Sequence, residues 1–157
     1  MKLEVQSAAN FLVHILRLAQ CNIKETTLQK FKENLIAEMY RSYRLRWFPE
    51  NPVKGSGYRI IRINAYKIDP ILVQAATKVR ISLSILSNNM PHLILWINPF
   101  EVSYMMKERT YILYEYEEGQ HDPWTPSSFS KNSKLKILNY PTKCQHRKQS
   151  KYYVYSN

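Results

Sequence analysis

The sequence predicts an α+β domain in which amphipathic helices pack on a small, mainly antiparallel sheet. Two observations indicate this class: apolar residues recur at helical spacing up to Tyr43, and short strand-like runs come mostly later in the chain. At 157 residues, 45% of them hydrophobic, the chain is long enough to bury one core. No internal repeat is visible, so we expect one folded domain.

The first two helices are predicted from apolar stripes and one capping pattern. The first stripe consists of Val5, Ala8, Ala9, Leu12, Ile15, Leu16 and Ala19. The second consists of Leu28, Phe31, Leu35, Ile36, Met39 and Tyr43. Thr26 and Gln29 have capping-box spacing, which predicts that the second helix begins there. Because the connection over residues 21–25 is short, we expect an antiparallel helix pair.

Proline and glycine shape the segment after the second helix. Pro49 and Pro52 stop the helix and favour an extended, irregular segment. Gly55 and Gly57 predict a turn with unusual backbone angles. Residues 58–64 then have the composition of a strand.

The rest of the domain is predicted to alternate between helix and strand. Asp69 as N-cap and Pro70 as first helical residue predict a third helix to about residue 79. Residues 82–87 predict a short further helix, and residues 93–97 a strand that Pro99 interrupts. Residues 100–105 and 110–116 predict a hairpin.

The strand pattern leaves the roles of Trp96 and Tyr58 open. Side chains alternate between the faces of a strand, so Leu93, Leu95 and Ile97 share the expected core face and Trp96 lies on the other. Trp96 then belongs to a second buried face, which the pattern slightly favours, or is an exposed contact for a partner. Tyr58 poses the same choice, because it would open its strand on the face opposite the isoleucines.

Charge separates the expected domain from a tail. Residues 1–118 contain 16 basic and 11 acidic residues, whereas residues 119–157 contain 7 basic residues and one acidic residue. We therefore predict a folded domain over 1–118 and a basic, Ser/Pro-containing tail over 119–157. The simplest interpretation of the tail is a solvated end, although its charge attracts phosphates without sequence preference. The two widely spaced cysteines and the lack of a secretory leader favour a soluble protein of a reducing, intracellular compartment.

Catalysis is not indicated, so no catalytic, metal or cofactor residue is predicted. The four histidines are scattered, and Gly55-Ser56-Gly57 lacks the Lys-Ser/Thr end of a phosphate loop. Direct RNA binding stays an alternative, because basic and aromatic residues are interleaved over residues 40–62. The basic residues are Arg41, Arg44, Arg46, Lys54, Arg59 and Arg62.

Two long ordered runs stand out in the chain: the first box, WFPENPVKGSGYRIIRIN over residues 47–64, and the second box, LILWINPFEVSY over residues 93–104. Together they resemble the two signature boxes of the BTG/Tob antiproliferative family. The helix start at Asp69-Pro70 and the tail segment Ser150–Val154 are also similar. The resemblance covers about residues 1–118 and implies the family's BTG-domain fold.

The resemblance implies a non-catalytic adaptor of the cytoplasm and nucleus. Its partner would be the DEDD-type deadenylase subunit of the Ccr–Not complex, so that it promotes shortening of messenger poly(A) tails and restrains proliferation; a transcription-cofactor role is also consistent with the family. The partner-binding residues carried over to this sequence are Tyr58, Trp96, Trp47, Asn98 and Glu101. Shorter members also contact the poly(A)-binding protein through the segment after the second box, residues 107–118 here. Its acidic residues are Glu115, Glu117 and Glu118, which could equally form a solvated strand end.

Several positions depart from the family pattern. Leu45-Arg46 replaces a His-His step, Asn51 replaces a lysine and Ile60 replaces a cysteine. Asn98 replaces an aspartate, which is expected to remove any charge-assisted hydrogen bond from that carboxylate to the deadenylase.

Overall fold

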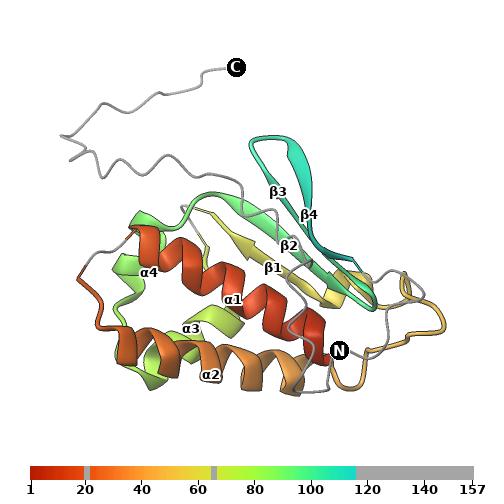
Figure 1. Cartoon of the computed structure of the whole chain (residues 1–157), viewed down its shortest axis with the longest axis horizontal. Coiled ribbons are helices and arrows are strands. Elements are labelled where there is room, and N and C mark those ends of the chain that lie inside the picture. Colours follow the sequence, from red (N-terminus) through yellow and green to blue (C-terminus); the bar gives the residue numbers. More distant parts are fainter. Residues whose placement is uncertain (20–21, 65–66, 116–157) are drawn as a thin grey trace, which may run out of the picture.

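The structure is a computed structural model that describes residues 1–19, 22–64 and 67–115 (Figure 1). Its elements confirm the α+β class. In chain order they are α1 (Lys2–Ala19), α2 (Glu25–Tyr43), the short 3₁₀ helix η1 (Ser56–Tyr58), β1 (Ile60–Ile63), α3 (Pro70–Lys78), α4 (Leu83–Asn89), β2 (Leu93–Asn98), β3 (Glu101–Met106) and β4 (Arg109–Glu115). The predicted tail lies outside the described residues, as do Cys21 and the last predicted hairpin residue, Tyr116. In the part of the chain that is described, no helix combines the length and apolar character that a membrane crossing requires.

The four strands form one antiparallel sheet in the order β1-β2-β3-β4. Ile60 of β1 lies opposite Trp96 of β2, and Trp96 lies opposite Ser103 of β3. Ser103 in turn lies opposite Ile112 of β4, beside a register shift between Val102 and Ser103. The sheet therefore places residues of both boxes and of the last strand in one row across a single face.

Helices cover the other face and enclose the core. Figure 1 shows α1 and α2 side by side and running in opposite directions, as the sequence predicted. The predicted stripes are buried except for Ala19 and Ile36, which are half-buried. Leu93, Leu95 and Ile97 join the same core cluster, which confirms the core face expected for β2. Burial of these stripes is the main force that holds the helices on the sheet.

The capping box predicted for the second helix is wrong. Helix α2 begins at Glu25, its N-cap is Lys24, and no side chain caps it. Gln29 donates instead to Glu33 Oε1 at 2.9 Å. The carboxylate of Glu25 accepts two hydrogen bonds from the Arg17 guanidinium of α1, at 2.5 and 3.1 Å. This ion pair joins α1 to the first turn of α2, where a negative charge also interacts favourably with the helix dipole. The helix therefore begins at Glu25, one residue before Thr26.

The strand predicted from residue 58 begins two residues later. Tyr58 belongs to η1, because its N–H donates to Gly55 O at 3.0 Å and the Arg59 N–H donates to Ser56 O at 2.9 Å. Gly55 has φ of 74°, which confirms an unusual backbone angle there. Gly57 does not adopt a positive φ, so the glycine prediction holds for the first residue only.

The other boundaries agree more closely with the prediction. Asp69 caps α3, since its Oδ1 accepts from the Ile71 N–H at 2.9 Å and Pro70 is the first helical residue. Helix α4 continues to Asn89, two residues beyond the predicted end. Strands β2, β3 and β4 each lie within one residue of their predicted bounds over the described chain.

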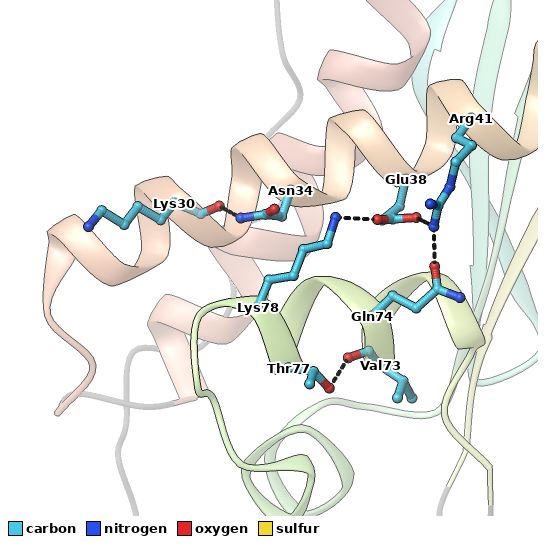
Figure 2. Close-up of polar contacts among 8 residues, drawn as sticks. All are labelled: Lys30, Asn34, Glu38, Arg41, Val73, Gln74, Thr77 and Lys78. Carbon is cyan, nitrogen blue, oxygen red and sulfur yellow. Dashed lines mark hydrogen bonds and ion pairs between the residues drawn. The ribbon is translucent and has the colours of Figure 1, made fainter.

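A polar network joins α2 to α3 (Figure 2). Glu38 is only 2% exposed, and its Oε1 accepts from Lys78 Nζ of α3 at 2.7 Å. Its Oε2 binds Arg41, which also donates to Gln74 Oε1 of α3 at 2.8 Å. The hydrogen bond from Lys78, together with the positive charges of Arg41 and Lys78, lowers the pKa of Glu38 against the opposing effect of its burial. The carboxylate therefore stays ionised and ties the two helices together.

Candidate partner-binding surface

The two boxes meet at one end of the sheet. The chain leaving Tyr58 enters β1, where Ile60 lies opposite Trp96. The Ile97 N–H donates to Arg59 O at 3.0 Å, so the pairing continues past the end of β1 toward η1. Tyr58 and the Trp96–Asn98 segment are therefore carried by neighbouring stretches of backbone.

Trp96 lies outside the core. Its neighbours along β2, Leu95 and Ile97, are fully buried against the helices, whereas Trp96 is half-buried on the face turned away from α1. Its cross-strand neighbours are Ile60 and Ser103, and beyond Ser103 lies Ile112, which is 55% exposed. The structure lies between the two predicted alternatives, because Trp96 is half-buried rather than buried or exposed.

Tyr58 is the more exposed of the two aromatic residues, with 67% of its surface accessible. Its ring lies under the guanidinium of Arg46, whose Cζ is 4.4 Å from the ring centroid. This cation–π contact gives the exposed ring a preferred position. Tyr58 therefore does not belong to the core.

Arg59 is a residue whose role the sequence reasoning missed. The sequence places it among the basic residues of an RNA-binding alternative, but its side chain is 0% exposed and cannot contact RNA. Burial lowers the pKa of its guanidinium, yet arginine remains protonated in proteins. A signal was present in the sequence: two-residue alternation along β1 places Arg59 on the same side as the buried Ile61 and Ile63.

Asn98, Glu101 and Trp47 are held by contacts within the domain. Asn98 Oδ1 accepts from Arg59 Nη2 at 3.1 Å. Glu101 Oε1 accepts from Ser103 Oγ at 2.7 Å, and Glu101 lies opposite Glu115 in the register of β3 and β4. Trp47 is half-buried against the core, with its ring 5.5 Å from Arg59 Cζ.

The turn between β2 and β3 is tied to the first helix. Phe100 has φ of 69° and is 45% exposed, and its N–H donates to Glu4 Oε1 at 3.1 Å. Glu4 is 5% exposed and also pairs with the amine of Met1 at 2.6 Å. The hydrogen bond from Phe100 to Glu4 therefore fixes the position of the second box relative to the start of α1.

The segment that precedes Tyr58 carries exposed basic residues. Arg44, Arg46 and Lys54 are exposed, and Lys54 Nζ lies 4.3 Å from the centroid of the Phe48 ring. Leu45 and Val53 in the same loop are 78% and 80% exposed. Of the predicted acidic run, Glu115 is exposed at the end of β4, whereas Glu117 and Glu118 lie outside the described residues. The described residues contain no group of three or more His, Cys, Asp or Glu side chains placed to hold a metal ion.

Comparison with known proteins gives one consistent result. The family model described as "BTG family" matches residues 1–116. Protein BTG2 of Rattus norvegicus is 41% identical over 117 residues, which cover 74% of this chain and 73% of that protein. Protein Tob1 of Homo sapiens is 36% identical over 110 residues, covering 69% of this chain and 31% of that longer protein. A solved structure, a variant of the C. elegans FOG-3 BTG/Tob domain, matches the fold with a TM-score of 0.65 at 18% identity, over 74% of this chain and 92% of that one.

Proposed function

This chain belongs to the BTG family, and on that premise we propose that it is a non-catalytic adaptor for the DEDD-type deadenylase subunit of the Ccr–Not complex. Membership supports an antiproliferative function in general. In the proposed role the chain brings the deadenylase to messenger RNA and promotes poly(A) shortening. It would act in the cytoplasm and nucleus.

The observation that carries the proposal is that an exposed Tyr58 and a half-buried Trp96 lie on neighbouring stretches of backbone at one end of the sheet. Tyrosine and tryptophan bury a large apolar area with few rotatable bonds, so they lose little entropy on binding. Both lie on backbone that is fixed by hydrogen bonds, Trp96 in the middle of β2 and Tyr58 in η1. A partner that covers this end would bury both rings at once.

The neighbouring predicted residues have a supporting role in this proposal. Asn98 and Trp47 are engaged with Arg59, and Glu101 is engaged with Ser103. Through these contacts they help to define the surface around the two aromatic side chains. A second proposed partner is the poly(A)-binding protein, which would contact the acidic end of β4 at Glu115.

Binding to the isolated deadenylase subunit, followed by calorimetry, tests the proposal. We expect Tyr58→Ala and Trp96→Ala each to weaken binding by about 2 kcal/mol or more, as truncated interface contacts do. The matched control is Leu83→Ala, which removes an apolar side chain, 42% exposed, from α4. Circular dichroism checks that all three variants stay folded. Unfolding of Tyr58→Ala or Trp96→Ala would mean that the truncated ring is part of the core.

RNA binding through the basic loop is the second candidate function. Arg44, Arg46 and Lys54 are exposed, and Arg46 lies over the ring of Tyr58. Single-stranded RNA sites combine basic and aromatic side chains in this way. If the wild-type chain binds no deadenylase but binds single-stranded RNA with an affinity that falls steeply with salt, this second function replaces the first.

A further inference from the structure

Among the charged residues that the structure describes as buried, Arg59 is the one without an ion-pair partner in the described chain. The described residues include three that are charged and buried: Glu4, Glu38 and Arg59. Glu4 pairs with the amine of Met1, and Glu38 pairs with Lys78 and Arg41. Within the described chain no carboxylate forms an ion pair with Arg59. Burying a charge without a partner of opposite sign is costly unless its hydrogen bonds are fully satisfied.

The hydrogen bonds of Arg59 are fully satisfied, by acceptors from both boxes. Each of its five N–H donors has an acceptor. Nε donates to Ile97 O at 3.1 Å, and Nη2 donates to Asn98 Oδ1 at 3.1 Å, both at the end of β2. The remaining donors reach carbonyls of the preceding loop: Arg46 O at 2.5 Å, Lys54 O at 2.9 Å and Pro52 O at 2.6 Å.

The loop over residues 46–56 depends on these bonds because its own backbone bonds are short-range. Along this described segment, each backbone–backbone hydrogen bond joins residues three positions apart, as in Asn51 N to Phe48 O and Ser56 N to Val53 O. Such turns fix local shape but do not fix where the loop lies on the sheet. The guanidinium of Arg59 supplies that link, because it binds three loop carbonyls and two groups of β2 together.

The exposed tyrosine is coupled to this centre through Arg46. The carbonyl of Arg46 accepts from Arg59, while the side chain of Arg46 lies over the Tyr58 ring. Gly55 leaves the room that this arrangement needs, since a Cβ there would lie 3.1 Å from Arg59 Nη1 and 3.3 Å from Arg46 O. A shift of the guanidinium would therefore move the loop and, with it, the support of the Tyr58 ring.

We propose that Arg59 is the positioning residue of the Tyr58–Trp96 surface. Its buried guanidinium fixes the loop of the first box on the end of β2, and so controls partner affinity without touching the partner. This inference rests on the proposed adaptor function, because it assigns the control of that binding surface.

Arg59→Lys is the first test variant. Lysine keeps the positive charge but has three donors on one nitrogen, which cannot reach five acceptors arranged around a planar fork. We expect faster amide hydrogen exchange over residues 46–58, unchanged exchange in α1, and about tenfold weaker binding to the deadenylase subunit. Arg80→Lys is the matched control, since it makes the same change at an exposed arginine after α3.

Asn98→Ala is the second variant, included in case Arg59→Lys unfolds the domain. It removes one of the five acceptors and leaves the guanidinium in place. We expect the same pattern at a smaller scale, with faster exchange over residues 46–58 and binding weakened by about threefold. If Arg59→Lys speeds exchange throughout the domain, Asn98→Ala decides the question.

Exchange is measured without a partner, so the two proposals can fail separately. Unchanged exchange over residues 46–58 in both variants overturns the role of Arg59. Faster exchange there with unchanged affinity also overturns it, because the loop would then not govern binding. A wild-type chain that does not bind the deadenylase overturns the proposed function, while loop exchange still shows whether Arg59 fixes the Tyr58 segment.

Discussion

Arg59 Nη2 donates a hydrogen bond to Asn98 Oδ1 at 3.1 Å and thereby joins the two boxes across 39 positions of sequence. The sequence alone suggested that Asn98 had lost a contact to the partner. The structure gives its side-chain oxygen a partner within the domain. Because Asn98 is neutral, its first effect is to leave the buried positive charge of Arg59 without a carboxylate at this position.

Asn98→Asp should raise the free energy of unfolding by about 1 kcal/mol. The present hydrogen bond is assisted only by the charge of the guanidinium, whereas a carboxylate would carry the opposite charge and give the buried Arg59 an ion-pair partner. Urea unfolding at neutral pH measures the change, and the gain should vanish when the aspartate is protonated in acid. A variant less stable than wild type at neutral pH would show that desolvation of the new carboxylate outweighs its attraction to Arg59.

Gly55→Ala should lower the free energy of unfolding by about 1–3 kcal/mol. Alanine strains the backbone at a φ of 74°, and its Cβ would crowd Arg59 Nη1 at 3.1 Å. The matched control is Gly57→Ala, because a Cβ at Gly57 meets no atom within 4 Å. We expect the control to lie within about 0.5 kcal/mol of wild type. Equal effects at the two glycines would contradict the tight fit at Gly55.

Glu38→Gln should lower the free energy of unfolding by about 1–2 kcal/mol at neutral pH. The folded-state pKa of Glu38 lies below its ordinary value of 4.5, chiefly because Lys78 donates a hydrogen bond to it. Its contribution is therefore complete above that ordinary value and is lost as the pH falls through the folded-state pKa. Urea unfolding across acidic pH should show the difference between wild type and Glu38→Gln shrinking as the pH falls. A difference that stays constant with pH would argue against the ion pairs as its source.

The double variant Lys107→Asn, Glu108→Gly should raise the free energy of unfolding by about 1 kcal/mol. These two residues connect β3 to β4 and have φ of 50° and 63°. Two positive φ angles in a two-residue hairpin loop are typical of a type I′ turn, in which Asn-Gly is preferred. Thermal unfolding measures the change, with Lys107→Ala as a control that keeps the strain. No gain from the double variant would mean that the original side chains stabilise the turn by contacts of their own.

Much of the fold was predictable because its determinants are local. The stripes of α1 and α2 recur at helical spacing, Asp69-Pro70 marks the start of α3, and the alternation of Leu93, Leu95 and Ile97 identifies the core face of β2. Each of these patterns depends on neighbours within one or two turns of chain. The ordered runs of the two boxes were equally readable, and they indicated the family.

The sequence by itself determined the α+β class, the order of the elements and the family. Only the tertiary structure decided that α2 begins at Glu25, that Tyr58 precedes its strand in a 3₁₀ turn, and that Arg59 is buried beneath the surface where Tyr58 and Trp96 lie. The physical reason is that Glu25 is bound by Arg17 on another helix, and Arg59 by carbonyls and an amide as far away as Asn98. Periodicity records which face of an element is apolar, but a buried charge is allowed only by acceptors that the folded chain brings together.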